Sequence, residues 1–394
     1  MSKHEQEMLL FVSLQGAIGT LAGFIGYFVV GVDETDAMFR FTAYMLCDAS
    51  GAALFVYLLG PRLGLTGRRL MRLSFLVPGA LLLCGGDSVP VMAAVYGFFL
   101  GLTWSARYWL EMSVLTDSER DSYASRSGAL AVAGGIIATL VATLCLTKTD
   151  NSSHVLYAGY GVVCVVAGLA LGRHVSEAPM VPATNPLGVI AQPEFRACLP
   201  LFFVESGLLG VGGAVGSVGA AMSLGSASDL GWVSTVAGLA GAVALYMTRK
   251  SRGVHNRAGW LGWSCLAVAI SFVLLGFSAL LPALFVAHSI LRAAAGPFLN
   301  ASEHVLNQRA LDIRGQLVDR IVARDLVMLV MRMGSLLAFW WLSNAMSPAH
   351  LLELGSTVLA LGAIAEHRVG QSWFGAATRG RTAGADNQLG GAGG

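Results

Sequence analysis

Long apolar runs recur along almost the whole chain and leave it few other ways to fold. A helix that crosses a lipid bilayer needs about 20 predominantly apolar residues. Short, more polar segments separate the runs, so we expect an all-α integral membrane protein with twelve transmembrane helices. The runs lie at about 8–31, 39–60, 70–86, 89–110, 127–147, 154–172, 197–222, 230–248, 258–276, 279–299, 325–345 and 349–367.

The composition agrees with lipid as the main solvent of this chain. Hydrophobic residues make up 55% of the 394 residues and charged residues 12%, whereas a soluble domain carries about 25% charged residues. The six cysteines show no CxxC spacing, so the sequence predicts neither a metal site nor a disulfide framework. No cofactor is predicted, and the net charge of +2 gives no reason to expect a nucleic-acid partner.

The basic residues predict the orientation, because lysine and arginine gather in cytoplasmic loops. With the N-terminus inside, twenty of the 25 lysines and arginines fall in segments on the inner side, and Lys148 alone falls in an outer loop. The other four lie within predicted helices. We therefore expect a multi-pass protein of the cytoplasmic (inner) membrane with both termini in the cytoplasm.

A proline-rich segment divides the chain into two halves. Four prolines within residues 173–196 make a continuous helix improbable there. We expect a cytoplasmic linker at 173–196 between two six-helix bundles at 1–172 and 197–368. The glycine-rich residues 369–394 are predicted to form a disordered cytoplasmic tail.

The two halves share weak sequence signals in the same order. Glycines line one face of the first predicted span and recur with the same rhythm in the seventh. The loop after the second span is basic, and so is the loop after the eighth. This matching order predicts two pseudo-symmetric bundles related by a parallel repeat.

The segment GPRLGLTGRRL, between the second and third spans, carries a resemblance to the major facilitator superfamily. Members of that family commonly have the pattern Gly-x-x-x-Asp-Arg-x-Gly-Arg-Arg/Lys at this place. The positions are filled here by Gly60, Gly64, Leu65, Gly67, Arg68 and Arg69. The match is partial, because Gly64 replaces the acidic residue and Leu65 the first basic one. The stretch IVARDLVMLVMRMG also resembles a pattern of some bacterial permeases of the family.

The resemblance implies the twelve-helix fold of that family and a transporter function. In the family this loop packs against the cytoplasmic end of the eleventh helix and helps to hold the outward-open state. We expect Asp325 to serve as the partner of Arg68 or Arg69 in such a latch. The segment SGALAVAGGIIATL lacks the proline that a family motif of proton-driven antiporters carries in the fifth helix.

Ionisable side chains inside a membrane are costly and often mark transport pathways. Asp48, near the middle of the second span, is read either as a protonatable group facing the central cavity or as a packing carboxylate held by a neighbouring helix. Glu205, in the seventh span, is the corresponding candidate of the C-terminal half. It could carry a proton or make a hydrogen bond that only serves helix packing.

Basic side chains complete the candidate set. His288 and Arg292 lie four residues apart and so share a helix face; Arg292 could bind an anionic substrate, lock Glu205 or form a structural ion pair. His288 could titrate near neutral pH or be a packing histidine. Arg332 is expected to line the cavity or the gate.

Two further residues are candidates for the gate at the inner end of the fourth span. Arg107 and Glu111 are four residues apart, and an intrahelical ion pair is the simplest interpretation.

These features predict a secondary active transporter for a small organic solute with an anionic group, such as a metabolite, siderophore or drug. We expect proton coupling, export and a monomer in the bilayer. Two alternatives stay open, a proton-coupled importer and a protein of this fold that serves as a membrane assembly factor or sensor. An enzyme is not expected, because the sequence shows no catalytic motif and no nucleotide-binding motif.

Overall fold

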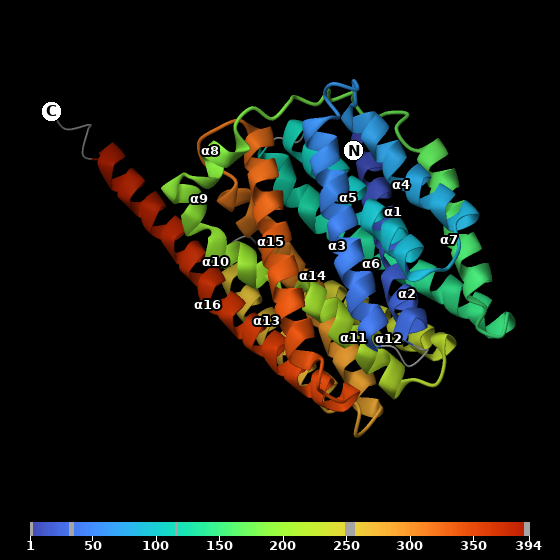
Figure 1. Cartoon of the computed structure of the whole chain (residues 1–394). Helices are drawn as coiled ribbons and strands as arrows, with labels where there is room; N and C mark the ends of the chain where they lie inside the picture. The colour runs from blue at the N-terminus through green and yellow to red at the C-terminus, as the bar shows by residue number, and fades with distance from the viewer. Residues whose placement is uncertain (1–2, 31–34, 115–116, 249–256, 390–394) are drawn as a thin grey trace.

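The computed structural model describes residues 3–30, 35–114, 117–248 and 257–389, which are helical almost throughout. The basic segment 249–256 and the last five residues of the predicted tail, 390–394, lie outside the described residues. The N-terminal half comprises α1–α7 (Figure 1). Its helices are α1 (Lys3–Gly19), α2 (Leu21–Val30), α3 (Thr35–Leu58), α4 (Gly67–Cys84), α5 (Val89–Val114), α6 (Asp117–Lys148) and α7 (Ser153–Ala170).

The C-terminal half comprises α10–α16 and includes one π-helical segment, η1. Two helices of five residues each, α8 (Pro186–Ile190) and α9 (Pro193–Ala197), interrupt the linker between the halves. The elements of the half are α10 (Leu199–Phe202), η1 (Phe203–Gly207), α11 (Leu209–Ser223), α12 (Ala227–Met247), α13 (Arg257–Gly276), α14 (Ala283–Ala310), α15 (Leu317–Ser343) and α16 (Pro348–Leu389).

Each predicted span coincides with a helical segment of the structure. The first span is divided into α1 and α2, and the seventh into α10, η1 and α11. Among the described residues, ten segments are long and apolar enough to cross a membrane. The remaining two predicted spans correspond to α4, which has three arginines in its first six residues, and to α14, which carries several ionisable residues. The chain is a multi-pass membrane protein.

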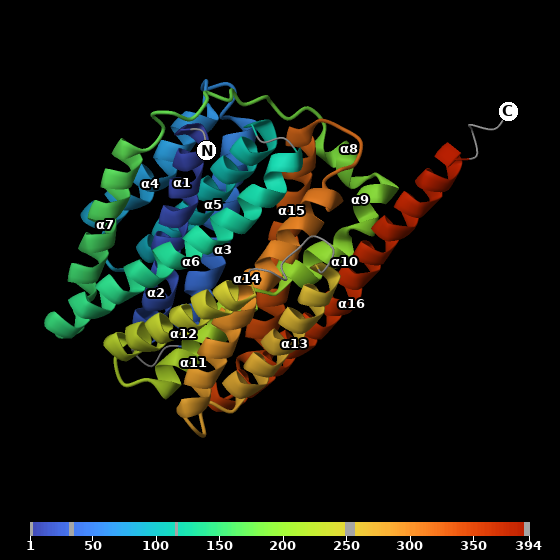
Figure 2. The same cartoon turned by 180° about the vertical axis from the view of Figure 1, so that it is seen from behind.

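The helices form two bundles that meet along their length (Figures 1 and 2). In the N-terminal half α3 packs on α5, α1 on α6, and α4 on α5 and α7; in the C-terminal half α13 packs on α14 and α16, and α12 on α14. Between the halves, α6 packs on α12, α3 on α15, and α2 on α11. The all-α membrane fold with two bundles is therefore as expected.

Glycine allows the closest helix contacts in the N-terminal half. At Gly134 of α6 an added Cβ would overlap the backbone carbonyl of Ser13 in α1, and at Gly101 of α5 it would overlap the carbonyl of Ala49 in α3. Small residues let helix backbones approach closely in membranes. These contacts explain why α1 pairs with α6, and α3 with α5, along much of their length.

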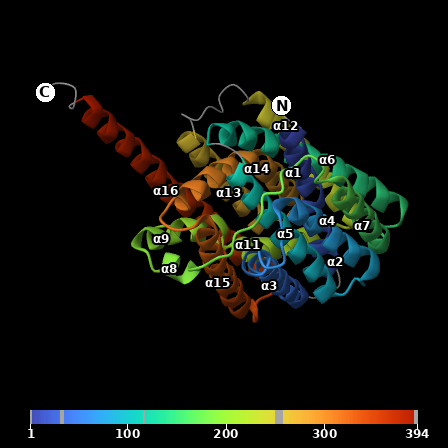
Figure 3. The ribbon, with the colours of Figure 1, turned by 90° about the horizontal axis from the view of Figure 1, so that it is seen from above.

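The segment between the halves runs over one end of the molecule, which we call the linker end (Figure 3). The opposite end, at the α4–α5 and α11–α12 turns, is called the far end. The Glu7 carboxylate of α1 accepts hydrogen bonds from the backbone N–H groups of Arg173 and His174, at 2.8 and 2.6 Å. The Asp319 carboxylate of α15 accepts from the N–H groups of Thr184 and Asn185, at 2.7 and 2.9 Å. The linker is thus attached to both halves by buried carboxylates.

The C-terminal helix is longer than the sequence predicts. The last span was expected to end near residue 367 and to be followed by a disordered tail, but α16 continues to Leu389. Its last turns project away from the bundle (Figures 1 and 3). The predicted domain boundary at 368 therefore falls inside one helix.

Candidate functional site

A cluster of charged and polar side chains lies near the linker end, where the C-terminal half faces α5 of the N-terminal half. Glu205 belongs to η1, a π-helical turn that interrupts the seventh predicted span. Single π-turns inside helices are frequent at functional sites. Its side chain is only 11% exposed.

Asn307 of α14 links Glu205 to a buried arginine. The Asn307 side-chain amide donates a hydrogen bond to Glu205 Oε1. Its carbonyl oxygen accepts one from Arg324 Nε at 3.1 Å. Arg324 Nη2 also lies 3.6 Å from Glu205 Oε1. The acid, the amide and the base come from three elements of one half and contact one another.

Arg324 also reaches the N-terminal half through aromatic rings. Its guanidinium carbon lies 5.4 Å from the ring centroid of Tyr108 in α5 and 5.7 Å from that of Phe202 in α10. An arginine at this distance over an aromatic face is attracted by the ring, more strongly when desolvated. Since Arg324 is 6% exposed, the contact with Tyr108 joins the two halves through a buried cation.

Asp325 and Arg332, both predicted candidates, flank this cluster on α15. Asp325 Oδ1 lies 3.7 Å from Arg324 Nη1, its sequence neighbour. Arg332 Nε donates to Ser206 Oγ at 2.9 Å, so this arginine holds the residue next to Glu205. The structure thus brings together three of the predicted residues, Glu205, Asp325 and Arg332.

Arg107 and Glu111 form the intrahelical ion pair that their spacing predicts. Arg107 Nε and Glu111 Oε1 are 2.7 Å apart, and Glu111 is 1% exposed. The Arg107 guanidinium lies 5.1 Å from the ring centroid of Trp104. Burial and the nearby Glu111 carboxylate raise the pKa of Tyr123, just before the membrane-spanning part of α6. That phenol therefore stays neutral beside the pair.

Asp48 lies apart from the cluster on α3. Its Cβ faces Gly97 of α5, where a larger residue would overlap it. The side chain is partly buried, and the described residues offer its carboxylate no hydrogen bond or ion pair.

His288 and Arg292 share a face of α14, as their spacing predicts, and this face packs on α13. His288 Nδ1 is hydrogen-bonded to the carbonyl oxygen of Ser271 at 2.7 Å, and its ring packs between Phe272 and Phe285. The Arg292 guanidinium carbon lies 4.7 Å from the ring centroid of Phe272. Both side chains therefore contact aromatic rings of their own half.

The glycines of the basic turn between α3 and α4 make that turn compact. Gly64 has φ +63°, a conformation that favours glycine. The Gly60 N–H donates to the Val56 carbonyl at 3.1 Å, and a Cβ at Gly67 would overlap the Leu110 side chain of α5.

The arginines of this turn contact the linker and the turn itself. Arg68 donates to the Val175 carbonyl at 2.8 Å and forms an ion pair with Glu177 at 2.7 Å. Arg69 donates to the Gly64 carbonyl at 3.1 Å. The expected latch between these arginines and Asp325 is not formed in this conformation, because the linker lies between the turn and α15 and supplies the acid.

At the far end the halves are held together by direct contacts. Phe39 of α3 stacks on Trp340 of α15 with ring centroids 5.7 Å apart, and Trp340 Nε1 donates to Asp36 at 2.9 Å. Tyr27 of α2 donates to the Leu224 carbonyl at 3.2 Å. These contacts join the halves at the far end.

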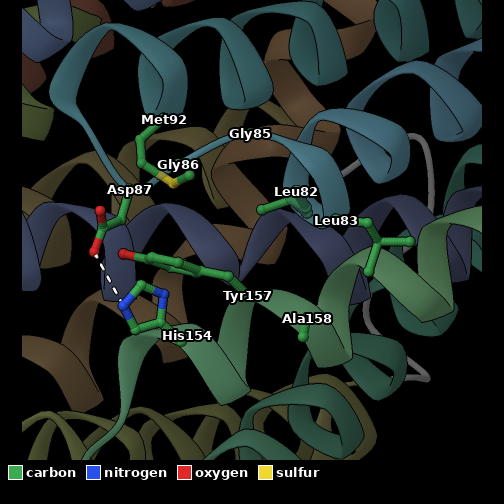
Figure 4. A pocket seen from close by; sticks show the side chains of 9 residues that line it. All are labelled: Leu82, Leu83, Gly85, Gly86, Asp87, Met92, His154, Tyr157 and Ala158. Atoms are coloured by element: carbon green, nitrogen blue, oxygen red, sulfur yellow. Dashed lines mark ion pairs between the residues drawn. The ribbon is translucent and has the colours of Figure 1, made fainter.

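A pocket of about 200 Å³ opens at the far end, within the N-terminal half (Figure 4). It lies between α4, α5 and α7. The imidazole of His154 and the carboxylate of Asp87 lie 3.6 Å apart at its edge, and both are largely exposed. The pocket contains none of the predicted site residues, so it is not the candidate site.

The sequence analysis missed four residues that the structure places at or near the cluster, three of them because the ends of two helices were drawn too short. The tenth span was predicted to end at 299 and the eleventh to start at 325, whereas α14 ends at Ala310 and α15 begins at Leu317. Polar residues within these extra turns were read as loop residues. Those missed are Glu303, Asn307 and Arg324, together with Glu366 of α16, which was placed in the last turn of the final span.

Comparison with known proteins identifies the fold. No protein-family model matches the sequence, and no curated protein sequence matches it. Among solved structures, a substituted form of the nucleoside transporter NupG is similar to this chain with a TM-score of 0.62 at 11% identity, covering 94% of this chain and 100% of that one. A second NupG structure gives 0.59 at 11% identity, with coverages of 95% and 99%. The likeness extends over nearly the whole chain and shows a shared fold.

Proposed function

We propose that this chain is a secondary active transporter of the major facilitator type. The observation that carries the proposal is the buried contact of Arg324 with Glu205 in one half and with Tyr108 in the other. Such a contact can be made and broken as two bundles rock about a central site. The fold shared with the nucleoside transporter NupG supports the proposal.

The proposed transport cycle alternates access between the two ends. The far end faces the outside, and the linker end, with its arginine-rich segments, faces the cytoplasm. In this conformation the Phe39–Trp340 stack joins the halves at the end proposed to face outside. Asp325 and the arginines of the α3–α4 turn are proposed to meet in another state of the cycle, after the linker has moved.

The proposed substrate is a small organic solute that carries an anionic group, with export as the direction. Arg332, at the edge of the cluster, and Arg292 are the cations proposed to receive it. The proposed energy source is a proton gradient, with Asp48 and Glu205 as carboxylates that could exchange protons. A neutral nucleoside is tested beside the anionic solutes, because the structures similar to this chain are those of a nucleoside transporter.

The test is reconstitution of the purified chain in liposomes. Solute movement and internal pH are followed for a panel of anionic metabolites and a nucleoside, with a pH gradient of either sign. We expect solute-dependent proton movement, lost in Asp48→Asn and Glu205→Gln and kept in Glu353→Gln, whose side chain is exposed on α16.

Two results would decide against parts of the proposal. If neither solute-dependent proton movement nor an effect of the Asp48 and Glu205 variants is found, transport fails as the explanation. If the solute enters only with an inward proton gradient when the linker end is inside, the chain is an importer, and the export direction is wrong.

A further inference from the structure

Two carboxylic acids from different helices face each other in the C-terminal half. Glu303 of α14 and Glu366 of α16 lie within side-chain hydrogen-bonding reach of each other. Neither residue belongs to the Glu205–Asn307–Arg324 cluster. We call these two residues the carboxyl pair.

Two carboxyl groups at hydrogen-bonding distance need a proton between them. Two carboxylates this close repel each other, so the second ionisation is costly and the pair holds its last proton more firmly than a lone carboxyl does. The cost is larger still inside a membrane bundle, where a charged carboxylate is poorly solvated. The pair is therefore suited to holding one proton.

Glu366 provides a second and independent sign of a bound proton. It is 5% exposed, and its Oε1 atom has no hydrogen-bond partner among the described residues. A buried polar atom left unsatisfied costs about 1–3 kcal/mol. A proton on this carboxyl removes its charge and lowers that cost. Glu303 is partly exposed.

The groups around the pair do not neutralise it with a close cation. The Cys265 thiol of α13 and the Glu205 carboxylate of η1 are near enough to interact with it electrostatically, and so is Arg292 of α14. The Arg292 guanidinium is packed on Phe272. His367 follows Glu366 on α16, and its ring lies against Gly262 of α13. The described residues form no ion pair with either glutamate.

The pair is connected to the contact between the halves. Glu303 and Asn307 are four residues apart on α14 and so share one face. Asn307 binds Glu205 and Arg324, and Arg324 packs on Tyr108 of the other half. A change of charge at the pair therefore changes the electrostatic potential at Glu205 and at Arg324, the arginine that joins the halves.

We propose that Glu303 and Glu366 form a proton-binding site that holds one shared proton and, on releasing it, weakens the Arg324–Tyr108 contact. When the proton leaves, the O–H bond of the carboxylic acid breaks, its electrons stay on the carboxylate, and water accepts the proton. The added negative charge draws Arg324 toward its own half. The role in coupling rests on the proposed transport function, whereas proton binding does not.

The test is infrared difference spectroscopy on the full-length chain in lipid nanodiscs, stepped between acidic and alkaline buffers. A protonated carboxyl gives a C=O stretching band that shifts when H₂O is replaced by D₂O. We expect such a band for the native chain and its loss in both Glu303→Gln and Glu366→Gln. The matched control is Glu353→Gln, on the exposed face of the same helix as Glu366. Proton release on the alkaline step should fall by about one proton per chain in each variant.

Each result supports or overturns the inference. An unchanged carboxyl band in folded Glu303→Gln and Glu366→Gln overturns it, with folding checked by elution volume and melting temperature. Loss of the band on adding NaCl at constant pH overturns it as well, because the pair then binds a sodium ion. A chain that shows the expected bands but moves no solute in liposomes refutes the proposed function and leaves this site standing. If both glutamine variants fail to fold, Glu303→Asp and Glu366→Asp must shift the band, and no shift contradicts the proposal.

Discussion

At the residue scale, Arg324 combines interactions that no other described side chain of this site makes together. It lies beside Glu205 and Asp325, donates to Asn307 and packs on two aromatic rings. A guanidinium suits this position because its planar group can donate in its plane and stack on rings above and below it. Burying such a charge is costly, and only its partners make it tolerable.

We predict that Arg324→Met destabilises the chain by about 3–5 kcal/mol, because it leaves Glu205 without its cation in a buried site. Thermal unfolding in detergent measures the effect. The double variant Arg324→Met/Glu205→Gln should recover part of the loss, since the unpaired charge is then gone. Arg314→Met, with an exposed side chain at the same end, is the control and should change stability by less than about 0.5 kcal/mol. Equal losses in the single and double variants would contradict the ion-pair explanation.

At the element scale, glycine positions decide which helices pair and how closely. Gly134 of α6 and Gly16 of α1 both leave room for the backbone of the partner helix. Gly128, one and a half turns before Gly134, has nothing within 4 Å of an added Cβ. The same residue type in the same helix therefore has a packing role at one position and none at the other.

We predict opposite effects for two alanine substitutions in α6. Gly134→Ala should destabilise the chain by about 1–3 kcal/mol, because the new methyl group overlaps the Ser13 carbonyl and forces α1 away. Gly128→Ala should be neutral or stabilise by up to about 1 kcal/mol through helix propensity. Melting temperatures of the two purified variants compare them directly, and a stable Gly134→Ala chain would rule out close α1–α6 contact.

The sequence predicted the residues at which helices begin and end less well than it predicted the helices themselves. The apolar pattern located each span, but it stopped where polar residues began, and α14 continues through Glu303 and Asn307. The polar side chains of these two residues have partners on neighbouring elements. Such partners cannot be read from one helix, so the inner turns that hold the candidate site were taken for loops.

At the scale of the whole molecule, the two halves touch at both ends through different chemistry. The far end is closed by stacked aromatic rings and hydrogen bonds, and the linker end by a buried cation on Tyr108. The linker itself is tied to α1 by Glu7 and to α15 by Asp319. Both sets of contacts are formed in this conformation, so rocking of the halves has to break one set while the other is kept.

We predict that Trp340→Ala moves the equilibrium toward a conformation open at the far end. The variant loses the stack on Phe39 and the hydrogen bond to Asp36, and an aromatic pair contributes about 0.5–1.5 kcal/mol, up to a tenfold change in population. Ser217→Cys, at a residue that faces Gly26 of α2, is made in a chain whose exposed Cys47 and Cys84 are replaced by serine. Its thiol should react faster with a membrane-impermeant maleimide added at the far end. Trp341→Ala is the matched control, since that side chain is 75% exposed. Equal labelling rates in the two variants would show that the stack does not hold the far end closed.

The sequence by itself determined that lipid surrounds most of this protein and where its spans lie. It also determined that nearby residues such as Arg107 and Glu111 share one face of a helix. These follow from apolar length and helical spacing, which are local properties. The tertiary structure alone decided the partners of the charges. Arg68 meets Glu177 of the linker, Arg324 meets Glu205 and Tyr108, and Glu303 meets Glu366. Each of these contacts joins segments far apart in the chain, and the free energy of a buried charge depends on what the other helices bring to it.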